Sequence, residues 1–360
     1  MKSPLITLPQ DTGPHAFSNV EWWYYFAFVK GDQGNEYSIM AAFFRVGELE
    51  FFKGHYFISS LCDLHQQTQK DQSVIDSKLV ANMVTIYLPL YLLFRPTDIA
   101  TWKLYGKLFL HQLPFPHLWM EHTPIQTNPT QLIFGNTSLT FKNDTTHQFH
   151  VHIQDKQKEW DLDFTPIKPI SLIGQDGKPD ELYYYSFTNN EVKGTIKNGE
   201  NLETVTGKGW FDHQWGRSSK FAQRIGWNWF GIQLDDNREL LISENRSMET
   251  GATSSQMANF IQQDGTLSFS RNVYIHPISF WKSPQTNITY PVEWNISIPD
   301  FAIELTVKAL FQEQEILILG PLRAIWEGAC IVNGIETSSN TIKNNISGKG
   351  FAELVGYANL

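Results

Sequence analysis

The chain has 360 residues, with 28 lysines and arginines against 37 aspartates and glutamates, which gives a formal charge of −9. This length suffices for two domains with ordinary hydrophobic cores. The basic residues are scattered and form no patch, which argues against a nucleic-acid-binding protein. The two cysteines, Cys62 and Cys330, are too far apart in the sequence for a metal-binding spacing or a disulfide framework, so we expect both in the core.

Short strand signals recur along most of the chain, with clusters of Gly, Asn, Asp and Pro between them. This spacing favours sandwich or barrel units over alternating strands and helices. The expected strands cover residues 24–29, 38–44, 55–61, 131–134, 147–153, 160–165, 182–186, 190–196, 205–214, 227–234, 239–244, 255–261, 292–298, 303–309, 329–335 and 350–357. We therefore predict an all-β protein.

One segment, at about 75–125, departs from the strand pattern. It holds an apolar run at 79–93 and a run rich in Pro and His at 113–117. We predict an insertion with some helix, which is either a buried prop or a mobile lid. Its most apolar stretch, 86–94, is too short for a membrane span and contains Pro89. We therefore expect no transmembrane segment, while peripheral contact with a membrane stays open.

The start of the chain, MKSPLITLP, lacks the continuous apolar stretch of a signal peptide. A cytoplasmic protein fits this start. A periplasmic or secreted protein whose leader has been removed fits it as well, and both locations stay open.

A motif near the middle of the chain returns near its end. GKGWFDHQWG at 207–216 is matched by GKGFAELVGY at 348–357, and tryptophan-rich segments open the two parts, EWWYY at 21–25 and WNWF at 227–230. A motif repeated at this spacing is typical of a repeated architecture. We interpret the pattern as the internal duplication of an all-β unit.

The two predicted domains are residues 1–216, which include the insertion, and residues 220–360. The chain holds 12 Trp, 13 Tyr and 25 Phe, which suits a β core and also the lining of a ligand cavity in a wide barrel. The aromatic residues at the two junctions are predicted to line one pocket near the domain junction. The predicted substrate-binding residues are Trp22, Tyr24, His55, Trp215, Trp227 and Trp229.

The ordered set of motifs resembles the AttH-like family, also described as the carotenoid 1,2-hydratase (hydroxyneurosporene synthase) family, over nearly the whole chain. The matching elements include LPQDTGPH at 8–15, EWWY at 21–24, YYYS at 183–186, the motif at 207–216 and WEG at 326–328. The resemblance implies two tandem lipocalin-like (calycin) antiparallel β-barrels. It also implies cofactor-free chemistry on unsaturated hydrophobic molecules, because bacterial members hydrate carotenoid double bonds and fungal relatives accelerate Diels–Alder cyclisation of polyenes.

His213 and Glu244 are the candidate catalytic residues. Protonation of an alkene needs an acid in a dry pocket with aromatic faces near the developing cation. Strand alternation places His213 between Phe211 and Trp215, where it is a proton donor, an orienting group or a core histidine bonded to a backbone carbonyl. Glu244 stands in the region where the resemblance implies an aspartate proton donor, and the alternative is an ion pair with Arg246.

Four other polar residues are expected to be structural anchors. Glu21, beside two tryptophans, is predicted to pair with Arg45. Asp212 is predicted to tie its strand to a turn, and Glu327 to play the part of Glu21 in the second copy.

We expect no metal ion and no cofactor. His15, His55 and His213 could line one cavity, but none of them belongs to a short-spaced pair of ligands. The short-spaced histidines at 147–152 lie on an alternating strand and are interpreted as a solvated edge. Loops typical of phosphate or dinucleotide binding are not found in the sequence.

Two functions from different classes fit these patterns. The first is a cofactor-independent enzyme that cyclises, isomerises or hydrates a polyene or isoprenoid-like small molecule. The second is a non-catalytic, lipocalin-like carrier of a lipophilic ligand. A pocket that only holds the substrate in a reactive conformer lies between them.

Overall fold

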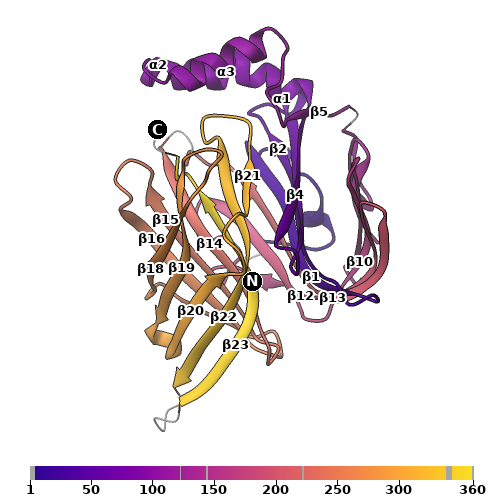
Figure 1. Ribbon diagram of the computed structural model, residues 1–360, viewed down its shortest axis with the longest axis vertical. Coiled ribbons are helices and arrows are strands. Elements are labelled where there is room, and N and C mark those ends of the chain that lie inside the picture. Colours follow the sequence, from indigo (N-terminus) through magenta and orange to yellow (C-terminus); the bar gives the residue numbers. More distant parts are fainter. Residues whose placement is uncertain (1–4, 122, 143–144, 221–222, 338–342, 359–360) are drawn as a thin grey trace. The chain divides into compact units, whose positions relative to one another are not determined.

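The computed structural model describes residues 5–121, 123–142, 145–220, 223–337 and 343–358 (Figure 1). Its contacts divide the chain into two units. The first comprises Met1–Pro169 and Gly177–Ser218, and the second comprises Ile170–Asp176 and Ser219–Leu360. The segment Ile170–Asp176 therefore departs from the predicted division, which assigns all of residues 1–216 to the first domain.

A curled, mostly antiparallel sheet forms the first unit and bends into a half-barrel (Figure 1). Its strands are β1 (Val20–Gly31), β2 (Glu36–Val46), β3 (Gly54–Asp63), β4 (Thr68–Ile75), β5 (Leu118–Trp119), β6 (Ile125–Thr127), β7 (Thr130–Phe134), β8 (Thr137–Phe141), β9 (Phe149–Gln154), β10 (Lys158–Pro166), β12 (Leu182–Asn198) and β13 (Asn201–Gly216). Their order across the sheet is β5-β4-β3-β2-β1-β13-β12-β10-β9-β8-β7-β6. Short 3-10 helices, η1 (Gln10–Thr12) and η2 (Glu50–Phe52), lie in its loops.

The predicted insertion is helical, and it belongs to the first unit. It contains α1 (Ser77–Asn82), the π-helical turn η3 (Met83–Tyr87), α2 (Leu88–Phe94) and α3 (Ile99–Phe109). Asp76 and Asp98 cap α1 and α3, because their side chains accept hydrogen bonds from the backbone of Leu79 and Thr101. The first three elements run on without a break.

This continuous helical stretch, Ser77–Phe94, has 18 residues and is long and apolar enough to cross a membrane by length and composition only. This criterion concerns length and composition only, so the expectation of no transmembrane segment stays a prediction. That expectation considered the apolar run at 86–94 alone, whereas the structure joins this run to α1 and η3. A third of the stretch, 33%, is buried.

A second curled antiparallel sheet forms the second unit. Its strands are β14 (Ile225–Leu234), β15 (Glu239–Ser247), β16 (Thr253–Ile261), β17 (Leu267–Ser270), β18 (Tyr274–Lys282), β19 (Thr289–Ile298), β20 (Ile303–Ala309), β21 (Glu315–Leu317), β22 (Ala324–Thr337) and β23 (Lys343–Val355). Most of them follow the order β17-β16-β15-β14-β23-β22-β20-β19-β18, and β21 pairs with β22. The 3-10 helix η4 (Pro299–Phe301) precedes β20, and β11 (Ser171–Leu172) lies in the segment Ile170–Asp176.

The two sheets repeat one topology, since β3-β2-β1-β13-β12-β10-β9 corresponds to β16-β15-β14-β23-β22-β20-β19. Glycines of the repeated motif explain why the register is the same. A Cβ atom on Gly207 would lie 2.0 Å from the carbonyl oxygen of Phe28, and one on Gly348 would lie 2.3 Å from that of Gln233. Only glycine allows the paired strands to approach this closely. Both closing strands, β13 and β23, therefore meet their opening strands at the same point.

Candidate active site

Side chains of the first-unit sheet alternate between two faces. The inner face carries Phe43 and Phe211, whose rings contact Phe134 and Phe141 across the half-barrel at centroid distances of 5.2 and 5.5 Å. The opposite face, here called the outer face, carries the neighbours of these residues in the sequence. Polar side chains are buried on both faces, and β13 contributes to each.

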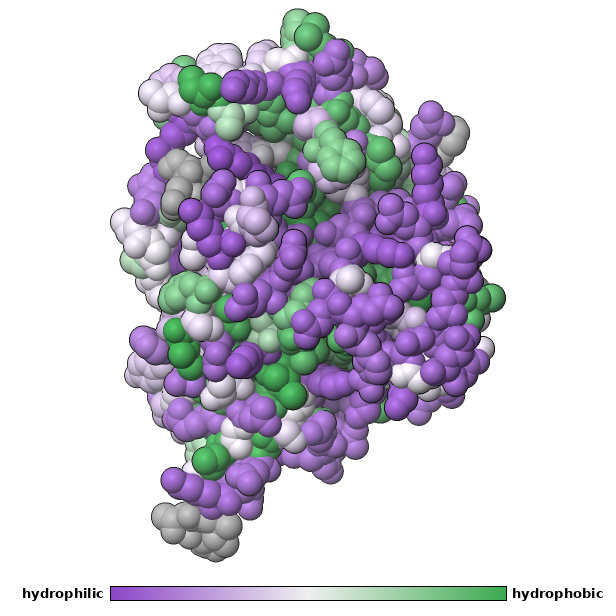
Figure 2. Space-filling view, in the orientation of Figure 1, coloured by the Kyte–Doolittle hydropathy of each residue, from purple (hydrophilic) through white to green (hydrophobic). Residues whose placement is uncertain are grey.

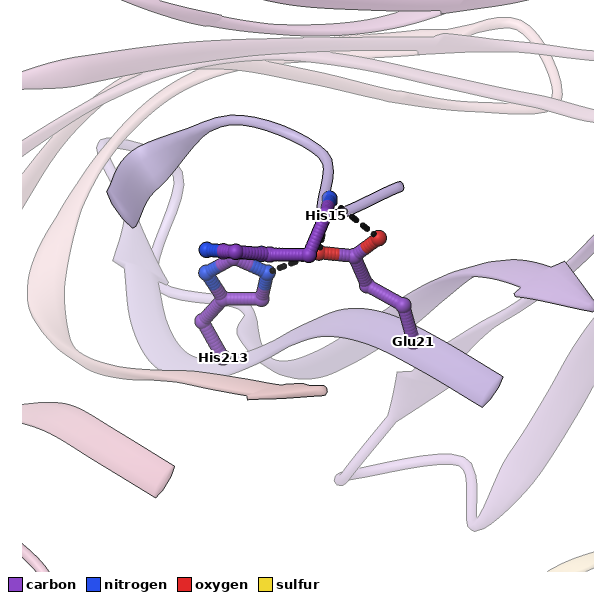
Figure 3. Close-up of side chains that lie close together, drawn as sticks. All are labelled: His15, Glu21 and His213. Carbon is purple, nitrogen blue, oxygen red and sulfur yellow. Dashed lines mark hydrogen bonds and ion pairs between the residues drawn. The ribbon is translucent and has the colours of Figure 1, made fainter. Parts of the chain in front are cut away.

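A cluster of polar residues lies on the inner face around Glu21, which is completely buried (Figure 3). The carboxylate of Glu21 lies 2.7 Å from Nδ1 of His15 and 3.1 Å from Nε2 of His213. It also accepts a hydrogen bond of 3.0 Å from the backbone N–H of His15. Arg45 pairs with its other oxygen at 3.6 Å, and Arg45 faces Glu21 across β1 and β2. The strand pairing thus supplies the partner that the sequence suggests for Glu21.

Burial opposes the ionisation of Glu21, but the hydrogen bonds from His15 and His213 outweigh it and lower its pKa to about 2. Burial lowers the pKa of His213, and the bond to Glu21 opposes this effect. Nδ1 of His213 lies 2.9 Å from the carbonyl oxygen of Asp11, so both ring nitrogens face oxygen acceptors. A neutral imidazole can donate from only one nitrogen. A neutral His213 therefore donates to only one of these two acceptors, and a protonated His213 would donate to both.

His15, Glu21 and His213 could also hold a metal ion, because one ligand atom of each lies within 4.8 Å of the others. Two histidines and a glutamate are a donor set that suits zinc. These atoms are hydrogen-bonded to one another, as Figure 3 shows. The third histidine considered from the sequence, His55, bonds through Nδ1 to Asp76 at 2.9 Å instead.

Aromatic rings enclose the imidazole of His213 on the inner face. Trp23 stacks on it with a centroid distance of 4.6 Å, and Trp215 lies at 4.7 Å. Tyr185 contacts it edge-on at 5.5 Å. Trp215 in turn stacks on His15 at 4.1 Å. The expected aromatic surroundings of His213 are therefore present, with Trp23 and Tyr185 added to the residues named from the sequence.

Asp212 lies on the outer face of the same strand and is buried, with 2% of its surface exposed. It accepts hydrogen bonds from the hydroxyl of Tyr184 and the indole N–H of Trp210, each at 2.7 Å, and from the hydroxyl of Ser186. Burial raises its pKa to about 7, although these three bonds favour the carboxylate. Asp212 thus bridges side chains of β12 and β13 inside the sheet, and the expectation that it ties a strand to a turn is wrong.

Register places an aromatic surface beside Asp212. Trp22 pairs with Phe44 on one side, and Tyr24 pairs with Asp212 on the other. The rings of Trp22 and Phe44 lie 6.4 Å apart, and both are partly exposed. One row across the outer face contains Tyr56, Phe44, Trp22, Gln214 and Tyr184, and the next contains Ile58, Ala42, Tyr24, Asp212 and Ser186.

The predicted grouping of Trp22 and Tyr24 with His213 and Trp215 is wrong. Glu21 pairs with Trp215 across β1 and β13, and paired residues of an antiparallel sheet point to the same face. Trp22 and Tyr24 therefore lie on the outer face, whereas His213 and Trp215 lie on the inner face. The opening and closing segments do meet, as predicted, but their alternation divides the aromatic residues between two sides.

In the second unit, Glu244 lies on the inner face of β15 and is buried. Its carboxylate accepts hydrogen bonds from Asn228 at 2.8 Å, Thr253 at 2.6 Å and Gln256 at 3.2 Å. Arg246 donates to the carbonyl oxygen of Val355. The carboxylate is thus bound by neutral donors rather than through the alternative pairing with Arg246.

A tyrosine completes this second polar cluster. The hydroxyl of Tyr357 donates to Oδ1 of Asn228 at 2.8 Å, and the guanidinium of Arg246 lies 3.5 Å from the ring centroid of Tyr357. Burial raises the pKa of Tyr357. The cluster therefore joins β14, β15 and the residues after β23.

Trp227 and Trp229 lie on the outer face of the second sheet, away from Glu244. The indole of Trp227 donates to Glu353 at 3.0 Å, and Trp229 pairs with Glu353 across the strands. Glu353 also pairs with Glu327 of β22. Because β22 corresponds to β12, Glu327 occupies the position of Ser186. Glu327 therefore does not stand at the position of Glu21, and its predicted anchoring role in the second copy stays a prediction.

The sequence did not identify Asp212 as a buried acid, nor Asp11 as a partner of His213. A signal for Asp212 was present in the YYYS motif, since Tyr184 and Ser186 supply two of its three donors. The bond between His213 and Asp11 had no comparable signal. Asp11 lies 202 residues away along the chain.

The family profile described as AttH-like matches residues 105–357. The chain belongs to this family. No curated protein matches it in sequence.

Solved structures share the fold of this AttH-like protein over nearly its full length. A candidate AttH from Nitrosomonas europaea is 20% identical with a TM-score of 0.75, covering 99% of each chain. Kievitone hydratase from Nectria haematococca is 14% identical with a TM-score of 0.72, covering 99% of this chain and 94% of its own. CghA with Sch210972 is 8% identical with a TM-score of 0.51, covering 94% of this chain and 88% of its own.

Proposed function

We propose that this protein is a cofactor-independent enzyme that protonates a hydrophobic, unsaturated small molecule and thereby hydrates, isomerises or cyclises it. The observation that carries this proposal is Asp212. Burial raises the pKa of its carboxyl group to about 7, so that a large share of it is protonated near neutral pH. Carboxylic acids held neutral in this way serve as general acids in other enzymes.

The residues around Asp212 suit the proposed reaction. The carboxyl O–H bond breaks as a C–H bond forms on the alkene, which leaves a carbocation and a carboxylate. Hydrogen bonds from Tyr184, Ser186 and Trp210 stabilise that carboxylate. The faces of Trp22 and Tyr24, which lie on the same side of the sheet, are positioned to stabilise the cation.

The reaction then ends in one of three ways. Addition of water to the cation, with loss of a proton, gives hydration. Attack by a second double bond of the same molecule, followed by loss of a proton, gives a ring. Loss of a proton from a neighbouring carbon gives an isomer. In each case the carboxylate of Asp212, which the first step leaves behind, would take the proton back.

We propose that His213 and Glu244 are orienting groups, and an acid–base role is the second candidate for each. His213 follows Asp212 on β13 and is fixed by Glu21 and Asp11 on the opposite face. It would act on Asp212 through the position of the strand rather than by touching the same substrate. Glu244 belongs to a separate polar cluster in the second unit. In this proposal the outer face of the first unit carries the proton donor, and the inner face holds the strand in position.

Two relatives agree with a small-molecule enzyme. One has hydratase in its name, and another was solved with the compound Sch210972. Both are less than 20% identical to this chain, so the reaction and substrate are argued from Asp212 and its neighbours.

The test begins with mass spectrometry of ligands extracted from the freshly purified protein. Any extracted compound, together with a panel of polyenes and isoprenoids, is then incubated with the wild type and with Asp212→Asn. The asparagine can keep the bond from Trp210 and donate to Tyr184, so the shape is retained. Turnover by the wild type and loss in the variant are expected. Tight binding of a ligand without turnover would favour the carrier function instead.

A further inference from the structure

The helical insertion presents an apolar surface to solvent. Ile86, Leu90 and Leu93, at intervals of four and three residues, lie on one side of the η3–α2 helix, and Leu93 is 72% exposed. The next residue, Phe94, is 74% exposed. In Figure 2, hydrophobic side chains gather with hydrophilic ones at the top edge, where Figure 1 places α2 and α3. A face this rich in exposed leucine and phenylalanine is typical of an interaction surface.

The following helix, α3, continues this surface. Successive residues turn by about 100° around a helix, which brings Ile99, Trp102 and Phe109 to one side. All three are exposed, whereas Thr101 and Leu108 on the opposite side are buried. Lys103 and Lys107 are exposed and lie next to this apolar side on the surface of the helix. α3 is therefore amphipathic outward, with cations beside its apolar stripe.

The charge of the helical part of the insertion, residues 77–110, is opposite to that of the protein. Residues 77–110 contain four basic residues and one acidic residue, whereas the whole chain has a charge of −9. Exposed Trp and Phe beside Lys are the composition that binds the boundary of an anionic membrane. A symmetric contact between two copies through this face would instead bring its lysines together.

We propose that α2 and α3, residues 88–109, dock on an anionic lipid surface, with Leu93, Phe94, Trp102 and Phe109 inserted at the interface and Lys103 and Lys107 at the headgroups. The helices lie in the interface and do not cross it. α1 is bound to the sheet, since Asp76 accepts from Leu79 and bonds to His55, while Asn82 donates to the carbonyl oxygen of Phe52.

The hairpin is held in shape without a lipid. Tyr91 donates to Asp98 at 3.0 Å, and the indole of Trp102 donates to the carbonyl oxygen of Pro96 at 3.0 Å. The apolar side chains are thus presented by a preformed element, so binding does not have to order the backbone.

The experiment is flotation of the full chain with vesicles of phosphatidylcholine, with and without phosphatidylglycerol. We expect binding to the anionic vesicles that weakens with salt. Lys103→Gln with Lys107→Gln should weaken it about 30-fold, since each lysine near the surface contributes a factor of about five. Leu93→Ser with Phe94→Ser should reduce binding to both vesicle types by about tenfold or more.

The matched control is Ile278→Ser with Phe280→Ser on β18, which are also exposed apolar residues but lie in the second unit. This variant should bind like the wild type. Circular dichroism and the thermal midpoint establish that each variant folds. Equal vesicle binding by the wild type and Leu93→Ser/Phe94→Ser, or no binding at all, overturns the proposal. A concentration-dependent dimer that these same changes abolish, without vesicle binding, identifies a second copy as the partner instead.

Discussion

The two units share strand order and register but carry different chemistry at equivalent positions. Tyr24 pairs with Asp212 in the first unit, and Trp229 pairs with Glu353 in the second. An acid thus stands at the same point of both closing strands. Asp212 accepts hydrogen bonds from the hydroxyls of Tyr184 and Ser186 and from the indole of Trp210, and Glu353 accepts a hydrogen bond from the indole of Trp227. The same backbone position therefore provides two different acids.

The inner faces differ further. His213 lies beside Trp23 in the first unit, and the equivalent pair in the second is Leu354 beside Asn228. The second unit places its buried carboxylate on the neighbouring strand, as Glu244. Both units thus kept the same backbone pairing after the duplication, because the motif glycines allow the strands to approach at only one register. The side chains at equivalent positions could change, because strand pairing depends on backbone hydrogen bonds.

The largest difference between the two units is expected when their equivalent acids, Asp212 and Glu353, are neutralised one at a time. Asp212→Asn should lower kcat about 10²-fold or more, because it removes the general acid. Glu353→Gln should lower kcat less than about tenfold, since only Asp212 takes part in proton transfer under the proposed mechanism. Steady-state rates on the substrate found by ligand extraction measure both. Equal losses in the two variants would contradict the assignment of the acid to the first unit.

The pH dependence of the same rates sharpens this result. The pKa of Asp212 is raised to about 7, so its protonated form decreases as pH rises through that value. The wild-type rate should therefore fall above about pH 7, and Asp212→Asn should lack this step. The raised pKa also means that Asp212 lowers stability progressively as pH rises from 3.8, where the carboxyl of the unfolded chain ionises, to about 7, so Asp212→Asn should gain relative stability over this range and keep it at higher pH. A wild-type rate that is flat from pH 6 to 9 would count against Asp212.

Glu21→Gln tests whether the inner face of the first unit is the more charged of the two. Removing one member of a buried ionic cluster costs about 3–5 kcal/mol. The pKa of Glu21 is lowered from 4.5 to about 2, so its contribution of about 3 kcal/mol is present above pH 4.5 and is lost as pH falls toward 2. Hydrogen exchange by mass spectrometry should localise the loss to peptides of the first unit. If Glu21→Gln loses stability at acid pH as the wild type does, Glu21 is not the origin of that loss.

Glu244→Gln provides the corresponding test in the second unit. Its carboxylate has only neutral donors, so the change leaves one donor facing another and should cost about 1–3 kcal/mol. If Glu244 is only an orienting group, kcat should fall less than about tenfold. Chemical denaturation and the same rate assay decide this. A loss of activity as large as that of Asp212→Asn would restore Glu244 as the acid.

The smallest expected effect is that of Trp227→Phe. The change replaces the indole by a smaller phenyl ring and removes the hydrogen bond to Glu353, and loss of that bond should cost about 1 kcal/mol. Trp23→Phe is the matched change in the first unit, where the indole donates to the carbonyl oxygen of Thr12 at 2.9 Å. Thermal unfolding compares the two. Because Trp23 also stacks on His213, its change should be the more harmful.

The all-β architecture, the duplication and the helical insertion at 75–125 could be predicted from the amino-acid sequence. These features depend on short-range patterns: alternation along strands, turn residues between them, and the glycines of the two GKG motifs. The resemblance to the AttH-like family rested on the same motifs, and the profile match at 105–357 confirms it. The contact between His213 and Trp215 could also be predicted from the local sequence, because the two residues lie on the same face of one strand.

Which side chains share a face of the sheet, and which of them are hydrogen-bonded, became known from the strand pairing in the folded protein. A shift of one residue reverses every side chain of a strand, so Trp22 and Trp215 could not be assigned to one side before the register was known. His213 is bonded to Asp11 of η1 and to Glu21 of β1, and the donors to Asp212 come partly from β12. Such contacts depend on how distant strands pair. The raised pKa of Asp212 depends on the same burial, which no local pattern encodes.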